Sequence, residues 1–189
     1  MISFLISRMA RAAQIVNVPI KLWLYRKGPI WNLIQRVVRA STPDGVLVFT
    51  MQSGELAGRK MRLHYQNHKP FWTEDYERDV PTAILALAKP GMVAYDIGAN
   101  IGYHSLLLAT LAGTAGKVFS FEPLPSNVDW LRHNLLLNAD LNKELIPKAV
   151  SNHVGESQLL VHRSITKNEV EGSDGYSDSF EDRILVPGL

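Results

Sequence analysis

The sequence predicts an α/β fold in which a mostly parallel sheet is flanked by helices. A short, largely apolar run, Met92 to Tyr95, leads into Asp96 and a glycine-containing turn. The next stretch, Tyr103 to Ala112, is apolar on nearly every face, and a second short run follows at Lys117 to Phe121. Short apolar strands that alternate with buried helices are typical of parallel sheets. We therefore expect a strand, a glycine turn, a helix and a second strand, in that order.

The turn between the first strand and the helix has the features of a ligand site. Gly98 and Gly102 bracket it, and glycine allows both a positive φ and the close approach of a ligand to the backbone. The N-terminus of the following helix offers unpaired N–H groups. Glu122 ends the second strand. In nucleotide-binding βαβ units, an acid at this place accepts hydrogen bonds from ribose hydroxyls.

The charge of the turn indicates which nucleotide it binds. Asp96 would repel the pyrophosphate of a dinucleotide, and the turn also lacks the first glycine of the dinucleotide-binding pattern. A ligand with a ribose, an ammonium and a sulfonium, and without phosphate, would be attracted by the same carboxylate. The predicted cofactor is therefore S-adenosyl-L-methionine.

Several segments together resemble the FkbM-type S-adenosylmethionine-dependent methyltransferases. The resemblance covers roughly residues 45 to 189. The matching segments are Asp96 to Gly102, Phe121 to Pro123, Asn134 to Asn138 and Lys148 to Ser151, with a lead-in at Tyr76-Glu77 and Lys89 to Gly91. The resemblance implies a Rossmann-like fold and methyl transfer, most simply to an oxygen of a sugar, polyketide or similar small molecule. It also places Ala149 near the adenine edge.

From the turn and the resemblance together we predict seven cofactor-binding residues. They are Asp96, Gly98, Ala99, Asn100, Gly102, Glu122 and Ala149. No catalytic residue is assigned, although His104 is the nearest titratable candidate for a general base. Two alternatives stay open: a non-catalytic cofactor-binding or interaction module with a truncated methyltransferase fold, and an NAD-dependent oxidoreductase.

Composition excludes several kinds of chemistry. The 189 residues include no cysteine, so disulfides, thiolate catalysis and cysteine-ligated zinc are absent. His64 and His68 have a metal-ligand spacing, but on a strand and its exit, so no metal is predicted. The net charge of +2 is uneven, because residues 1–40 hold seven Lys or Arg and no acid. The acidic remainder argues against a nucleic-acid partner.

We divide the chain into three regions. Residues 1–40 form a basic amphipathic helical extension, residues 41–91 a β-hairpin and a lead-in helix, and residues 92–189 the S-adenosylmethionine-binding half of a methyltransferase domain. The extension either docks on the domain or contacts a membrane surface, and a transit peptide is a third reading. It contains no run of about 18 apolar residues. We expect a cytoplasmic protein, with peripheral membrane contact as the alternative.

The remaining elements follow from local patterns. The hairpin strands are Val46 to Met51 and Arg59 to Tyr65, followed by a helix at Val80 to Ala88. After Glu122 we expect Ser126 and Asp129 to cap a helix that packs through Val128, Leu131 and Leu135. Further expectations are a strand from Glu144 to Val150 across Pro147, an extended piece at Gln158 to His162, and a loop from Arg163 to Asp182.

The sequence also predicts an incomplete sheet. Methyltransferases of this type resemble one another in having further strands, the next of which faces the acceptor. We therefore expect an uncovered strand edge, partly uncovered apolar faces at Leu106 to Leu111, self-association, and weak or absent methyl transfer by residues 1–189 alone.

Overall fold

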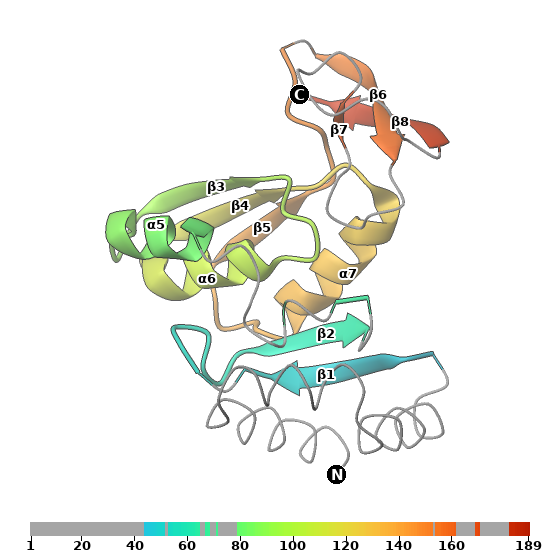
Figure 1. Ribbon diagram of the computed structural model, residues 1–189. Coiled ribbons are helices and arrows are strands. Elements are labelled where there is room, and N and C mark those ends of the chain that lie inside the picture. Colours follow the sequence, from blue (N-terminus) through green and yellow to red (C-terminus); the bar gives the residue numbers. More distant parts are fainter. Residues whose placement is uncertain are drawn as a thin grey trace. The chain divides into compact units, whose positions relative to one another are not determined.

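The computed structural model describes residues 44–51, 53–64, 67–68, 71, 79–152, 154–161, 169–170 and 182–189 (Figure 1). The expectations for residues 1–40, for the Tyr76-Glu77 lead-in and for most of 163–182 lie outside these residues. The chain divides into two compact units, Met1–Tyr76 and Glu77–Leu189. The hairpin and the lead-in helix therefore belong to different units.

In the first unit, the predicted half-buried hairpin is confirmed. Strands β1 (Val46–Thr50) and β2 (Lys60–His64) pair in antiparallel register, with Leu47 opposite Leu63 and Phe49 opposite Met61. These four apolar side chains are buried, whereas Val48, which alternates with them, is exposed. This alternation is what a strand with one buried face requires.

The two histidines of this unit serve the backbone. The His64 N–H donates to Nδ1 of His68 at 3.1 Å, and the Asn67 N–H donates to Nδ1 of His64 at 3.2 Å. Burial, reinforced by the nearby His64, lowers the pKa of His68 to about 4. In the part of the chain that the structure describes, no three His, Cys, Asp or Glu side chains are grouped to hold a metal ion.

The second unit contains the predicted parallel sheet. Its elements are α5 (Asp79–Leu87), β3 (Val93–Ile97), α6 (Tyr103–Ala112), β4 (Lys117–Phe121), α7 (Pro125–Leu136) and β5 (Lys143–Ile146). The strand order is β3-β4-β5, all parallel. Helices α6 and α7 lie on the same side of this sheet (Figure 1), as two right-handed crossovers require. None of the described helices is long and apolar enough to cross a membrane.

The two faces of this sheet differ. Ser105 of α6 contacts Asp96, so Asp96 points to the helix side, and its neighbours Tyr95 and Ile97 point to the other side, where each is 64% exposed. Helix α6, in contrast, buries Leu106 and Leu107 and has no exposed residue. Between Leu106 and Leu111, the residues Leu108, Thr110 and Leu111 are partly exposed, as expected, but the more open apolar surface lies on β3.

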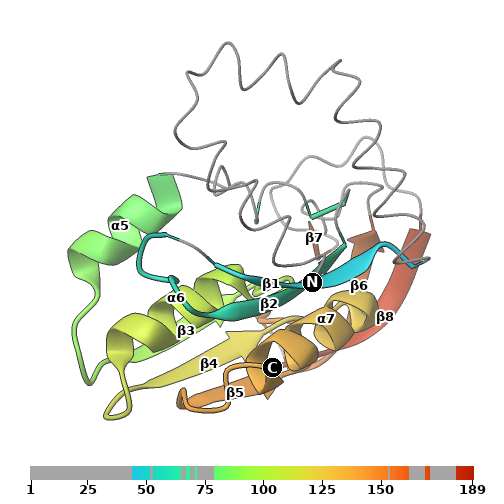
Figure 2. The ribbon, with the colours of Figure 1, turned by 90° about the horizontal axis from the view of Figure 1, so that it is seen from below.

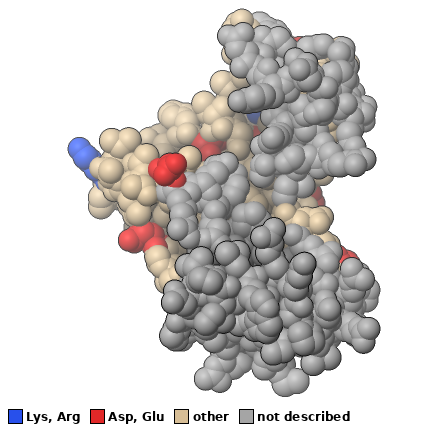
Figure 3. Space-filling model, in the orientation of Figure 1, with Lys and Arg blue, Asp and Glu red and all other residues tan. Residues whose placement is uncertain are grey.

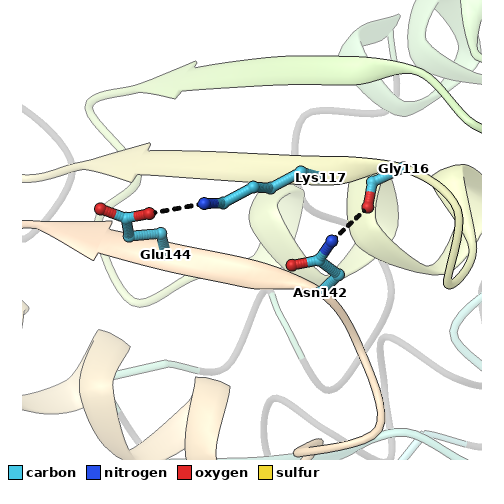
Figure 4. Close-up of polar contacts among 4 residues, drawn as sticks. All are labelled: Gly116, Lys117, Asn142 and Glu144. Atoms are coloured by element: carbon cyan, nitrogen blue, oxygen red, sulfur yellow. Dashed lines mark hydrogen bonds and ion pairs between the residues drawn. The ribbon is translucent and has the colours of Figure 1, made fainter.

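The open face carries an aromatic and charged layer. The ring of Tyr95 stacks on Phe119 and Phe121, with centroids 5.4 and 6.2 Å apart. The Lys117 ammonium lies 4.5 Å from the centre of the Phe119 ring and pairs with Glu144 at 2.8 Å. Figure 4 shows this ion pair beside the hydrogen bond from Asn142 to the Gly116 carbonyl, so β4 and β5 are joined at the strand starts.

A second sheet follows the parallel one. Strands β6 (Gly155–Val161), β7 (Glu169–Val170) and β8 (Asp182–Gly188) form an antiparallel sheet in the order β7-β6-β8, with β6 and β8 side by side (Figures 1 and 2). The extended piece at Gln158 to His162 belongs to β6, apart from His162, which lies outside the described residues. Strand β8 was not predicted, and the loop expected from Arg163 to Asp182 is interrupted by β7.

Two predicted boundaries need correction. Strand β5 ends at Ile146 and does not cross Pro147, since proline has no N–H for the ladder. Helix α7 begins at Pro125 after Leu124 and has no side-chain cap, so the predicted capping by Ser126 and Asp129 is wrong. Proline is preorganised for the first helical position. The predicted core stripe of this helix, Val128, Leu131 and Leu135, is buried.

Candidate cofactor-binding site

The turn between β3 and α6 is built from alternating left-handed residues. Gly98, Asn100 and Gly102 have φ values of +79°, +50° and +92°. The Gly98 and Ala99 N–H groups both donate to the Phe121 carbonyl, at 2.9 and 2.8 Å, and the Gly102 N–H donates to Ala99 at 2.8 Å. The turn is thus bonded to the end of β4, and such unusual backbone angles persist only where the surroundings fix them.

Glu122 lies inside this turn. Its Oε2 accepts the Asn100 N–H at 2.7 Å, and its Oε1 accepts the Leu124 N–H at 2.9 Å and Nδ2 of Asn127 at 3.4 Å. The residue is 5% exposed, and burial raises the pKa of its carboxyl, against the lowering effect of these hydrogen bonds. The carboxylate therefore joins the glycine turn to the start of α7.

Asp96 is the second carboxylate of the site. Ser105, in the first turn of α6, donates its hydroxyl to Oδ2 of Asp96 at 2.5 Å. Burial raises the pKa of Asp96, while the Ser105 hydrogen bond and the nearby His104 lower it. The charge of Asp96 in turn raises the pKa of Glu122. Two carboxylates thus lie at one glycine turn whose sequence, residues 96–102, contains no basic residue.

Helix α7 closes the other side of the turn. Nδ2 of the fully buried Asn134 donates to the Ile101 carbonyl at 2.8 Å. A β-carbon on Gly102 would lie 2.6 Å from Cδ1 of Leu131, so α7 packs directly on the turn. In the sequence, Asn134 stands out only as part of the family resemblance. A polar residue beside the apolar stripe of a helix is the signal that could have identified it.

The structure brings six of the seven predicted cofactor-binding residues together, at the turn and the end of β4. Ala149 lies in a separate small core with Leu159 and Val186, and is 2% exposed. Its N–H donates to Pro187 at 2.8 Å and its carbonyl accepts the Leu189 N–H at 3.0 Å. The side chain of Ala149 is thus packed, and any contact with an adenine would involve the residues around it. The cofactor-binding role of all seven stays a prediction.

His104 is half-buried at the start of α6. Its ring lies 5.5 Å from that of Tyr103, in an edge-on arrangement. It lies close enough to Asp96 to lower the pKa of that carboxyl, which places it near the turn. These contacts give His104 a place beside the site without assigning it a proton-transfer step.

Two curated proteins to which this chain is similar are named as methyltransferases. The chain is 35% identical over 83 residues to the hexuronic acid methyltransferase AglP of Haloferax volcanii, which is 42% of this chain and 33% of that protein. It is 44% identical over 45 residues to a protein-L-isoaspartate O-methyltransferase of Methanococcoides burtonii, 24% of this chain and 22% of the relative. The chain thus spans a third or less of these two curated relatives.

A solved structure and a family match complete the comparison. The structure of TYW2 from P. horikoshii in complex with MeSAdo is similar with a TM-score of 0.44 and 23% identity, over 60% of this chain and 39% of that one. The methyltransferase FkbM domain matches residues 96–187, from the first carboxylate of the turn to strand β8. This family implies S-adenosyl-L-methionine as the cofactor. Residues 96–187 therefore belong to the FkbM methyltransferase domain family.

Proposed function

We propose that this protein binds S-adenosyl-L-methionine at the turn 98–102 and takes part in methyl transfer to an oxygen of a sugar, polyketide or similar small molecule. One observation carries the proposal: the Asn100 N–H, which faces the inside of the turn, is bonded to the protein's own carboxylate, Glu122. A dinucleotide would bring its pyrophosphate to such N–H groups. Here an internal anion already occupies that place, so a phosphate is repelled and a cationic ligand is favoured.

The two carboxylates have different parts in this proposal. Asp96 is partly satisfied by Ser105 and supplies negative charge for the ammonium of the ligand. A carboxylate offers about four acceptor positions, and Glu122 uses them for Asn100, Leu124 and Asn127. Ribose hydroxyls would take the remaining position and compete with the 3.4 Å contact from Asn127, the longest of the three. The bound cofactor would supply the methyl group, carried on its sulfonium.

Only the names of the two relatives indicate which kind of methyl acceptor to test first. The longer of the two matches is to a protein named as a hexuronic acid methyltransferase, over 83 residues, against 45 residues for the isoaspartate enzyme. Both names describe acceptors rich in oxygen. We therefore place a sugar-type acceptor first for a catalytic assay.

Calorimetry on the purified chain tests the cofactor assignment. Binding of S-adenosylmethionine or S-adenosylhomocysteine, with none of NAD, is the expected result. Glu122→Ala should weaken it by about 1.5–3 kcal/mol, because the ribose hydroxyls lose a charged acceptor. Thermal unfolding of the same variant separates loss of the ligand contact from loss of the fold. Tight NAD binding would contradict the proposal, and absence of all binding would favour a non-catalytic interaction module.

The place of the protein in the cell is a second, separate proposal. We propose a cytoplasmic protein in which the basic residues 1–40 dock on the domain or, as the alternative, contact anionic membranes. Each Lys or Arg near such a surface contributes about 1 kcal/mol, and salt screens the attraction. The alternative expects co-sedimentation of the full chain with anionic vesicles at low salt, reversed at high salt. Equal sedimentation of a variant without residues 1–40 would argue against the contact.

A further inference from the structure

We propose that Asn134 is a positioning residue that fixes the glycine turn for its ligand, by holding the Ile101 carbonyl from the side of α7. The proposal rests on the function proposed above, because it concerns affinity for that cofactor. It starts from the 2.8 Å hydrogen bond between Nδ2 of Asn134 and the Ile101 carbonyl.

The burial of Asn134 makes this hydrogen bond unusual. Its side chain is 0% exposed and follows Leu131, also 0% exposed, along the face of α7 that packs on the turn. At such a position a leucine would remove more apolar surface from water, whereas an asparagine must have its amide satisfied. A buried polar group with good partners adds little net stability, but it permits one arrangement of the groups that it joins. Asn134 therefore specifies where Ile101 lies.

The turn needs such a constraint because its backbone is left-handed at Gly98, Asn100 and Gly102, and because its other hydrogen bonds come from the end of β4. The Gly98 and Ala99 amides are held by the Phe121 carbonyl, and the Asn100 amide by Glu122, all at the end of β4. Asn134 instead acts from helix α7. It holds the carbonyl of Ile101, the residue immediately before Gly102 and the first turn of α6. Together these bonds fix the N–H groups of residues 98–100 and the carbonyl of Ile101. Loss of the helix-side bond would let residues 101–102 move while the β4 side stays in place.

The chain offers a matched control on the same helix. Asn138 is 4% exposed, and its Nδ2 donates to the Asn134 carbonyl at 2.9 Å. Asn138→Ala, like Asn134→Ala, thus removes a buried amide that donates to a backbone carbonyl. The two hydrogen bonds are of similar length, 2.9 and 2.8 Å. The lost bond ends on the backbone of α7 and not on the turn.

Two readouts test the proposal on the full chain. The first is hydrogen exchange of the amides in residues 97–103 without ligand, and the second is the dissociation constant for S-adenosylhomocysteine. Asn134→Ala should speed exchange in this segment and weaken binding by roughly two- to tenfold. Asn138→Ala should lower thermal stability by a similar amount and leave both readouts within about twofold of the wild type.

A second variant covers the case in which Asn134→Ala does not fold. Asn134→Leu keeps the number and branching of the side-chain heavy atoms and removes the hydrogen bond, so it should avoid the cavity that alanine leaves and still show the faster exchange and weaker binding. Wild-type exchange and affinity in a folded Asn134→Leu would overturn the proposal, as would equal effects of the Asn134 and Asn138 variants. If the wild type binds no S-adenosylhomocysteine, the proposed function fails, and exchange in residues 97–103 still decides the role of Asn134.

Discussion

The two faces of the parallel sheet differ in the exposure of their side chains: helices cover one face, and the other is open. On the helix side, side chains such as Ser120 are fully buried, Glu122 and Asn134 form hydrogen bonds with the backbone of the turn, and Asp96 accepts one from Ser105 of α6. On the other side, Val93, Tyr95 and Ile97 are 59%, 64% and 64% exposed. The packed face is therefore where we propose that the ligand binds, and the open face is where we expect any association with other chains. In the view of Figure 3, the described charged side chains are few and lie apart from one another among uncharged residues.

The largest expected effect comes from adding one methyl group to the packed face. Gly102→Ala should cost about 2–4 kcal/mol of unfolding free energy, because φ is +92° and the new β-carbon would lie 2.6 Å from Leu131. Gly98→Ala has a φ of +79° but nothing within 4 Å of the new atom, so it should cost about 1–2 kcal/mol. Chemical unfolding of both variants measures the difference. Equal losses would mean that α7 does not press on Gly102.

The packed face should also set the pH dependence of stability. Burial raises the folded-state pKa of Asp96 and Glu122 above their ordinary values of 3.8 and 4.5. Above those ordinary values the unfolded chain therefore binds fewer protons than the folded one, so the contribution of these groups to stability falls as pH rises through the window. Asp96→Asn should flatten this fall, seen in urea unfolding from about pH 4 to pH 7. Asp129→Asn, a change on an exposed part of α7, should not.

On the open face we expect substitutions to act on association more than on folding. Tyr95→Lys places a charge in the exposed row of an edge strand, which is a common way for proteins to block pairing between edges. It should lower self-association in sedimentation velocity, at a stability cost of about 0.5–1.5 kcal/mol from the lost stacking on Phe119. Leu136→Lys, at a residue that is 69% exposed on α7, is the control. The same decrease in both variants would point to a general effect of charge.

The smallest effect should come from the ion pair on the open face. Lys117 and Glu144 lie 2.8 Å apart, with side chains 38% and 51% exposed (Figure 4). Exposed pairs contribute about 0–1 kcal/mol. A double-mutant cycle with Lys117→Ala and Glu144→Ala should give a coupling energy in that range, reduced by salt. A larger value would indicate that the contact of Lys117 with the Phe119 ring strengthens the pair.

What the sequence could predict was local. Helix α6 and strand β4 have the predicted bounds, because apolar runs and bracketing glycines determine them over a few neighbouring residues. The start of α7 was missed because the Leu124 N–H is taken by the carboxylate of Glu122, which also holds Asn100. The sequence shows an acid at the end of the second strand, but it does not show which groups that acid contacts in the folded chain.

Strand β8 shows the same limit at longer range. Its local signal is the short apolar run Ile184 to Val186, and its partner β6 lies across a segment that the sequence presents as a polar loop. Ala149 was placed by resemblance near an adenine, yet its burial depends on residues 187–189, far along the chain. Such contacts arise from tertiary pairing, which periodicity does not report.

The pairing of Ala149 with Gly188 has a consequence for synthesis of the protein. Strands β3 to β5 and their helices join segments that are neighbours in the chain, so they can form while the rest is still being translated. The peptide around Ala149 must wait for β8 to leave the ribosome. Until then Leu159 cannot pack against Val186. The cluster against which Leu124 packs is therefore incomplete. A nascent chain would thus have a formed glycine turn before the cluster of Ala149, Leu159 and Val186 is complete. Ligand binding during translation would show that the turn binds without this cluster.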